Sequence, residues 1–358
     1  MKRIVLTGGG TAGHVTPNIA LLPALQAAGY EIAYVGSYEG IEKKLIADFN
    51  IPYTGISTGK FRRYLDPKNF SDPFRVMKGF VEARNYLKNY QPDVVFSKGG
   101  FVSVPVVRAA ASLHIPCIIH ESDMTPGLAN KLCIPVAEKV CCNFPETMKN
   151  IPADKAVLTG SPIRAELAEG SKLAGLNMCG FTANKPVIMV IGGSLGAANV
   201  NKAVRDALPK LLEDFQVVHL CGKDKIDNLL LNTPGYKQFE YIKAELKDIF
   251  AMADIVISRA GANAICELLA LKKPNILIPL PAASSRGDQL LNAASFEAQG
   301  YSIVLNEDDI TTNLLVDKVH ELYFNRQNYV DAMSKSHQMD AVKTIMELIN
   351  AAADKKTN

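Results

Sequence analysis

Short apolar runs recur along the chain, and each is followed by a turn of small residues and then by a stretch with helical periodicity. The clearest runs lie at residues 4–7, 93–96, 187–191 and 254–257. A continuous apolar run of this length is typical of a parallel strand that is buried on both faces. The pattern therefore predicts an α/β fold with doubly wound, Rossmann-like parallel sheets.

The two halves of the chain resemble each other. Residues 93–100 read DVVFSKGG and align with residues 254–261, which read DIVISRAG. The first glycine-rich turn, residues 8–14, corresponds in the same way to residues 192–197. We therefore expect two similar domains whose parallel sheets face each other across a cleft, each opening its loops onto it.

Four strand-to-helix turns are built from small residues, at positions 8–14, 97–101, 192–197 and 258–261. Such turns present free backbone N–H groups and the positive end of a helix dipole, which suit a bound anion. Glu267 follows the last turn on a helix, where a carboxylate can accept hydrogen bonds from sugar hydroxyls. The turns indicate two phosphorylated ligands; for any single turn, the alternative is an ordinary α/β connection with a solvated glutamate.

Titratable side chains lie at the same predicted edge of the first sheet. His14 directly follows the first glycine-rich turn, and an imidazole titrates near neutral pH, so His14 is a candidate general base. The alternative is a structural or capping histidine. His120 and Glu121 end a further strand, and the carboxyl ends of parallel strands lie at one edge. Arg164 lies in the segment that leaves the first domain and could reach a phosphate.

Length and composition restrict the classes of function. The 358 residues suit two domains of roughly 100–200 residues each, which we place at 1–162 and 163–340, with 341–358 as a C-terminal helix that packs back on the first domain. The net charge of +3 does not by itself indicate nucleic-acid binding. No apolar run approaches the roughly 20 residues of a membrane span, and the N-terminus reads as a first strand, not a signal peptide. The seven cysteines then read as core thiols in a reducing compartment, and no Cys/His spacing resembles a zinc site.

Residues 58–90 combine aromatic and basic side chains. Four apolar residues recur at helical spacing with basic residues between them: Phe70, Phe74, Met77 and Val81. A basic amphipathic helix can lie on an anionic membrane surface. The commoner explanation of such a pattern is a helix that packs on the sheet and leaves its basic face in solvent. Nucleic acid is a weaker third partner.

Three sets of motifs, in order along the chain, closely resemble the MurG family, the bacterial peptidoglycan N-acetylglucosaminyltransferases of the GT-B fold. They are residues 8–14 (GGGTAGH), residues 192–197 (GGSLGA), and residues 258–267 with 288–292 (SRAGANAICE and DQLLN). The resemblance runs nearly end to end. It implies an inverting transfer of GlcNAc from UDP-GlcNAc to the 4-hydroxyl of MurNAc in undecaprenyl-pyrophosphoryl-MurNAc-pentapeptide (lipid I), giving lipid II at the cytoplasmic face of the cell membrane.

The resemblance also assigns the domains and the site. The first domain would take lipid I and associate with the membrane through Phe70, Phe74, Met77, Phe80 and nearby Lys and Arg, while the second would bind UDP-GlcNAc. His14 is the first choice for the catalytic base and Glu121 the second. The acceptor pyrophosphate would lie on Gly9, Gly10, Gly99 and Gly100. The donor set would comprise Thr11, Ala12, Gly13, Arg164, Ser194, Ile242, Ala262, Asn263, Ala264, Ile265, Cys266, Glu267, Gln289 and Asn292, with Asp288 as a further sugar contact.

Some features depart from the family or leave alternatives open. Where some members carry Gln-Asn after His-Glu, this chain has Ser122-Asp123, so the asparagine contact to GlcNAc is not carried over, and whether Asp123 replaces it stays open. No Asp-X-Asp motif is evident, so we expect no essential metal and no cofactor besides the substrates. The alternatives are another UDP-sugar glycosyltransferase or a UDP-GlcNAc 2-epimerase of the same fold, a catalytically silent nucleotide-sugar-binding scaffold, and an NAD-dependent oxidoreductase. The missing acid after the second strand counts against the last.

Overall fold

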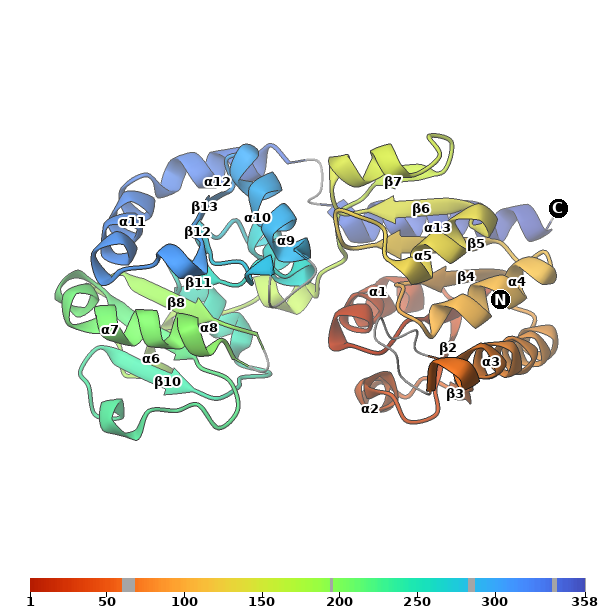
Figure 1. The fold of residues 1–358 in the computed structure, drawn as a ribbon, viewed down its shortest axis with the longest axis horizontal. Coiled ribbons are helices and arrows are strands. Elements are labelled where there is room, and N and C mark those ends of the chain that lie inside the picture. The colour runs from red at the N-terminus through yellow and green to blue at the C-terminus, as the bar shows by residue number, and fades with distance from the viewer. Residues whose placement is uncertain (60–67, 194–195, 283–286, 337–339, 358) are drawn as a thin grey trace. The chain divides into compact units, whose positions relative to one another are not determined.

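The computed structural model describes residues 1–59, 68–193, 196–282, 287–336 and 340–357, with only the backbone described at 68–73 and 356–357. The chain divides into two compact units (Figure 1). Unit 1 comprises Met1–Arg164 and Asp340–Asn358, and unit 2 comprises Ala165–Met339. The chain therefore returns to unit 1 at its end.

Unit 1 is built on a seven-stranded parallel sheet in the order β3-β2-β1-β4-β5-β6-β7. Its strands are β1 (Arg3–Thr7), β2 (Glu31–Ser37), β3 (Tyr53–Ile56), β4 (Val94–Ser97), β5 (Cys117–Glu121), β6 (Lys139–Cys142) and β7 (Ala156–Leu158). Its helices are α1 (Thr16–Ala27), α2 (Ile41–Ile46), α3 (Lys68–Tyr90), α4 (Ser103–Ser112), α5 (Leu128–Cys133) and α13 (Ala341–Thr357).

Both faces of this sheet are buried, as continuous apolar strands require. Successive side chains of a strand point to opposite faces, so Val5 joins one core with α3 and α4 while Ile4 and Leu6 join the other. The second core includes Ile345 and Ile349 of α13 together with residues of α1. The C-terminal helix α13 thus covers part of the sheet that contains β1, the first strand of the chain.

Unit 2 repeats the architecture with a six-stranded parallel sheet in the order β10-β9-β8-β11-β12-β13. Its strands are β8 (Val187–Ile191), β9 (Gln216–Leu220), β10 (Tyr236–Phe239), β11 (Ile255–Ser258), β12 (Asn275–Leu277) and β13 (Ser302–Val304). Its helices are α6 (Lys172–Cys179), α7 (Ala198–Asp214), α8 (Leu246–Met252), α9 (Ala262–Ala270), α10 (Asp288–Ala298), α11 (Thr312–Phe324) and α12 (Arg326–Ser334). The predicted α/β class with two doubly wound sheets is confirmed.

One segment differs from the expectation. The polar, Gly- and Asn-rich composition of residues 170–185 predicts a loop, yet α6 lies within it. Ser171 caps the helix by accepting a hydrogen bond from the Ala174 N–H, and Gly180, at φ 68°, ends it. Gly175 faces α8 so closely that a Cβ there would lie 2.4 Å from Asp248 O. Packing against α8 therefore stabilises a helix that the composition alone does not predict.

The seven cysteines are free and buried, which confirms that they are core thiols. Burial raises the pKa of most of these thiols, so they remain protonated at neutral pH. None of the helices in the described ranges combines the length and the apolar character that crossing a membrane demands.

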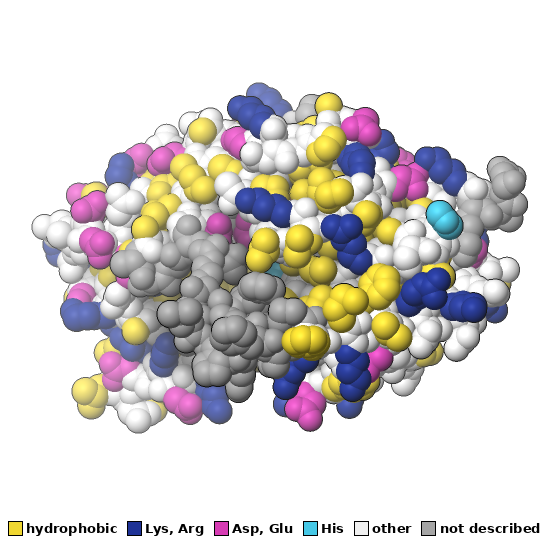
Figure 2. Space-filling model, turned by 45° about the vertical axis from the view of Figure 1, so that its right-hand side comes forward, with side chains coloured by type: hydrophobic (Ala, Val, Ile, Leu, Met, Phe, Trp, Pro, Cys, Tyr) yellow, Lys and Arg dark blue, Asp and Glu magenta, His cyan; other side chains and the backbone are white. Residues whose placement is uncertain are grey.

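Helix α3 packs on the sheet through Ala83 and Leu87 and exposes its opposite face. Phe74 is 78% exposed and Met77 63% exposed, and Val81 is exposed beside them. Phe80 lies partly buried against the core, whereas the side chain of Phe70 is outside the described residues. In Figure 2, apolar side chains gather among Lys and Arg side chains on one face of the molecule. Exposed basic residues of α3 are Arg75, Lys78, Arg84 and Lys88.

Candidate active site

The four glycine-rich turns follow the strands at the switch point of each sheet. In unit 1, β1 pairs with β4, and the chain leaves these two neighbours toward opposite edges of the sheet. In unit 2, β8 and β11 are the corresponding pair. Ligands of open parallel sheets bind beyond the carboxyl ends of the strands at such a point. We call the four turns the β1 loop (residues 8–14), the β4 loop (98–101), the β8 loop (192–197) and the β11 loop (259–261).

The β1 and β4 loops interlock within unit 1. Gly10 has a φ of 86°, and a Cβ there would lie 2.5 Å from the Phe101 ring. Gly100 has a φ of 83°, and a Cβ there would lie 2.3 Å from Gly9 O. Any other residue would be strained and would collide with the facing loop. The predicted pyrophosphate positions Gly9, Gly10 and Gly100 are therefore brought together, and Gly99 lies next to them in the chain.

His14 ends a short 3₁₀ turn, Ala12–His14, and is half-buried. Its Nδ1 lies 3.1 Å from Gly9 O and 3.1 Å from Thr11 Oγ1. A carbonyl oxygen can only accept, so the neutral ring that satisfies Gly9 carries its proton on Nδ1. Nε2 is then the unprotonated nitrogen, which suits a general base.

Glu121 is buried at the end of β5 and is occupied by neighbouring donors. Its oxygens accept hydrogen bonds from Asp123 N at 2.9 Å, Gly127 N at 3.0 Å and Asn130 Nδ2 at 2.8 Å. These contacts shape the segment between β5 and α5, including the residues that replace the family's Gln-Asn. Because protein donors already occupy these oxygens, the geometry favours His14 over Glu121 as the candidate base.

Lys98, the first residue of the β4 loop, is 1% exposed. Its Nζ lies 2.9 Å from His120 Nδ1 and also contacts Ser122 Oγ. His120 Nε2 lies 2.9 Å from Gly160 O. Burial and the charge of Lys98 hold the pKa of His120 well below its usual value, so the ring is neutral. The sequence patterns indicated no role for Lys98, although a lysine directly after a predicted buried strand is an unusual feature.

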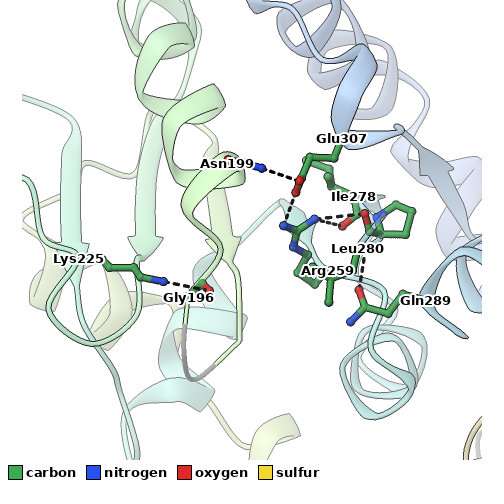
Figure 3. Close-up of polar contacts among 9 residues, drawn as sticks. Gly196, Asn199, Lys225, Arg259, Ile278, Leu280, Gln289 and Glu307 are labelled. Carbon is green, nitrogen blue, oxygen red and sulfur yellow. Dashed lines mark hydrogen bonds and ion pairs between the residues drawn. The ribbon is translucent and has the colours of Figure 1, made fainter. Parts of the chain in front are cut away.

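The β8 loop rests on the end of β9. Gly196 has a φ of 67°, and a Cβ there would lie 1.9 Å from Cys221 O. Lys225 Nζ donates to Gly196 O at 3.3 Å, as Figure 3 shows. Ser194, the predicted diphosphate ligand in this loop, lies outside the described residues.

Arg259 of the β11 loop is buried and bonds to backbone. Its Nη1 donates to Ile278 O at 3.0 Å and Pro279 O at 3.2 Å, and its Nη2 forms an ion pair with Glu307 (Figure 3). Glu307 in turn accepts from Asn199 Nδ2 at 2.7 Å. Arg259 therefore ties the β11 loop to the segment after β12 and to the start of α7, a role that the sequence did not reveal.

Helix α9 begins at Ala262 without a side-chain cap on its first-turn amides. The first N–H groups of an α-helix make no intrahelical bond, so the first turn of α9 can present backbone donors to an anion. Ile265 and Cys266 are buried, as is Ile242, and their contacts with a donor stay predictions. Glu267 is half-buried farther along the same helix.

Two amides of α10 hold the neighbouring loops. Gln289 Oε1 accepts from Leu280 N at 3.1 Å (Figure 3). Asn292 is 1% exposed, and its Nδ2 donates to Ala260 O at 3.2 Å. Asn292 therefore positions the β11 loop, and its contact with GlcNAc stays a prediction. Arg164 is half-buried at the end of the first segment of unit 1.

A buried histidine, His219, is linked through Asn201 to the carbonyl on which the β8 loop packs. His219 lies between Asn201 Oδ1 and the Tyr236 hydroxyl, each 2.9 Å away, and Asn201 Nδ2 donates to Cys221 O at 2.9 Å. Cys221 O is the carbonyl against which Gly196 packs. Burial, followed by the charge of Arg205, lowers the pKa of His219 to about 3. Across the described residues, no group of three or more His, Cys, Asp or Glu side chains is arranged to hold a metal ion.

Comparisons with known proteins agree with this architecture. Residues 4–142 match the glycosyltransferase family 28 N-terminal domain, and residues 187–349 match the glycosyltransferase family 28 C-terminal domain. A protein of Lachnospira eligens is 65% identical over 349 residues, covering 98% of this chain and 99% of the relative. A protein of Lachnoclostridium phytofermentans is also 65% identical over 349 residues, covering 98% of each. Both relatives are named UDP-N-acetylglucosamine--N-acetylmuramyl-(pentapeptide) pyrophosphoryl-undecaprenol N-acetylglucosamine transferase.

Solved structures show the same fold. The crystal structure of Acinetobacter baumannii MurG matches with a TM-score of 0.78 and 29% identity, covering 98% of this chain and 100% of that chain. A putative UDP-N-acetylglucosamine 2-epimerase from Listeria monocytogenes matches with a TM-score of 0.73 at 14% identity, covering 99% of this chain and 98% of that chain. At that identity the second match shows the fold alone.

The buried state of His219 predicts a pH-dependent stability of unit 2. Its native pKa is lowered, so the neutral ring stabilises the fold above the ordinary value near 6.5, and this stability is lost as the pH falls toward about 3. In urea unfolding from pH 7 to 4, His219→Gln should lose less stability per pH unit than the wild type, by up to about 1.4 kcal/mol. Exposed His114→Gln is the control. Equal slopes for the wild type and His219→Gln would contradict the assignment.

Proposed function

The chain belongs to glycosyltransferase family 28, and we propose that it transfers GlcNAc from UDP-GlcNAc to undecaprenyl-pyrophosphoryl-MurNAc-pentapeptide. The observation that carries this proposal is the 65% identity, over 98% of the chain, to relatives named for this transfer. The glycine-rich loops at both switch points support it, since the reaction needs sites for two diphosphate-containing substrates. The product is the lipid-linked disaccharide pentapeptide, lipid II, used in peptidoglycan synthesis.

Unit 2 binds the donor in this proposal. The diphosphate lies on the β8 loop and the first-turn amides of α9, and Glu267 accepts hydrogen bonds from the ribose. The backbone at Ile242 reads uracil. Gln289, with Asp288, binds the GlcNAc hydroxyls while keeping its bond to Leu280 N. Asn292 acts mainly by donating to Ala260 O, which positions the β11 loop.

Unit 1 binds the acceptor. The β1 and β4 loops take the lipid pyrophosphate, and Thr11 to Gly13 touch the donor sugar. The MurNAc O4 attacks C1 of GlcNAc, the bond from C1 to the UDP oxygen breaks with inversion, and the O4 proton passes to Nε2 of His14. UDP leaves with the electron pair, and its charge is stabilised by the α9 amides, the β8 loop and Arg164. These groups make an essential metal unnecessary in the proposal.

The exposed face of α3 docks the enzyme on the cytoplasmic surface of the cell membrane. Phe74 and Met77 would enter the lipid interface, and the flanking Lys and Arg side chains would attract anionic headgroups (Figure 2). Phe80 contributes less, because it packs against the core. This placement brings unit 1, the acceptor domain, to the lipid that carries its substrate.

The transfer itself is tested with labelled UDP-GlcNAc and a short-chain lipid I analogue, with and without EDTA. We expect a labelled disaccharide product with release of UDP at equal rates in both conditions. If EDTA abolished product formation, the assignment as a glycosyltransferase would stand, but the metal-free mechanism would be contradicted. UDP-GlcNAc binding without any product would contradict the proposed function, and conversion of UDP-GlcNAc without acceptor would indicate an epimerase.

The base is tested by His14→Asn, whose amide can still donate to Gly9 O but has no group that titrates near neutral pH. We expect kcat to fall by about 10²- to 10⁴-fold with little change in UDP-GlcNAc binding, because the O4 proton loses its acceptor. The acidic limb of the pH profile should also disappear. Turnover close to that of the wild type would exclude His14 from this role.

The membrane face is tested by the double variant Phe74→Ser, Met77→Ser with vesicles that contain anionic lipid. Inserting a Phe or Met side chain contributes roughly 1.5–3 kcal/mol, so the variant should bind at least about tenfold more weakly. Leu229→Ser, at a residue of unit 2 that is 94% exposed, is the matched control. Equal vesicle binding by the double variant and the wild type would refute the docking face.

A further inference from the structure

Glu42, at the start of α2, is a fully buried glutamate beside the β1 loop. Its Oε1 accepts from Ser37 N at 3.0 Å and Ser37 Oγ at 2.5 Å, and its Oε2 accepts from Gly10 N at 3.1 Å. Burying a carboxylate is costly unless donors surround it, and here three donors do. These three hydrogen bonds therefore fix the position of the carboxylate.

Three glycines from separate segments make the space for this side chain. A Cβ at Gly40 would lie 2.1 Å from Glu42 Oε1, one at Gly9 would lie 2.5 Å from its Cδ, and one at Gly36 would lie 2.8 Å from its Cγ. The Tyr53 hydroxyl donates to Ser37 O at 2.5 Å on the same side. Burial, followed by the charge of Glu42, raises the pKa of Tyr53. The β1 loop, the end of β2 and the start of α2 thus converge on one carboxylate.

The hydrogen bond to Gly10 N has a consequence for His14, because Gly10 N and Gly9 O belong to the same peptide group. The N–H and C=O of a trans peptide point in opposite directions. Glu42 holds the N–H side at 3.1 Å, and Gly9 O on the other side lies 3.1 Å from His14 Nδ1. Fixing one side of this rigid plane fixes the direction of the other.

We propose that Glu42 is a positioning residue that acts on His14 through the Gly9–Gly10 peptide. The carboxylate orients this peptide so that Gly9 O accepts the Nδ1 proton, which leaves Nε2 unprotonated toward the acceptor hydroxyl. The arrangement resembles a carboxylate that fixes the tautomer of a neighbouring histidine, with one peptide group interposed. The inference rests on the proposed function, since it assumes that His14 is the base. It also means that the Gly10 N–H is held by the protein and that an anion would use other amides of the loop.

The test compares Glu42→Gln with the exposed control Glu39→Gln in the full-length protein. A glutamine has one acceptor oxygen and one amino group, so either Gly10 N or Ser37 N loses its acceptor. We expect Glu42→Gln to lower kcat roughly 10- to 100-fold, with the KM for UDP-GlcNAc unchanged and the acidic limb of the kcat profile shifted to lower pH. Glu39→Gln should match the wild type.

A second readout does not depend on turnover. In ¹⁵N imidazole spectra, the His14 signal is the one that His14→Asn removes. We expect it to report an Nδ1–H tautomer in the wild type and a mixture of tautomers in Glu42→Gln. An unchanged tautomer and pH profile would overturn the proposal.

Should Glu42→Gln not fold, Ser37→Ala removes only the hydrogen bond from the Ser37 hydroxyl to Glu42. This variant should change kcat and the tautomer in the same direction but less, and no change would again overturn the proposal. A wild type that transfers nothing to the lipid I analogue would instead refute the proposed function.

Discussion

The candidate binding loops depend on one constraint, which is that a glycine-rich loop in each unit passes within contact distance of a neighbouring loop. Gly100 lies against the carbonyl of Gly9 in unit 1, and Gly196 lies against the carbonyl of Cys221 in unit 2. A single added Cβ at either position would push the loops apart. The glycines are therefore required by the protein's own packing as well as by close approach of a ligand.

Buried polar side chains hold the segments around these loops. In unit 1, Lys98 contacts the His120 side chain, and Glu121 accepts from Gly127 N. In unit 2, Arg259 donates to Ile278 O and Asn292 donates to Ala260 O. Buried groups of this kind are costly unless their bonds are made, so their geometry is well defined and the loops they hold are rigid. Rigid amides can stabilise the charge that develops on a leaving diphosphate without reorganising during the reaction.

Much of this arrangement could be predicted from the sequence. The continuous apolar strands and the repeated turn motifs gave the two parallel sheets and the positions of all four loops. The supporting residues could not be found in this way: Glu42 lies on a short helix that no strong periodicity marks, and the space for its side chain depends on Gly9, which is distant in the chain, as well as on the nearby Gly36 and Gly40. Helix α6 was missed for a related reason, because its stability comes from contact with α8 and not from its own composition.

In the proposed function, unit 2 receives the nucleotide diphosphate at the start of α9 and on the β8 loop. Hydrogen exchange of the full-length protein with and without UDP tests this placement most directly, since amides that bind a ligand exchange more slowly. We expect slower exchange for amides 262–264 and for the β8 loop, with residues 98–101 unchanged. Protection of the β1 and β4 loops with none at α9 would contradict it.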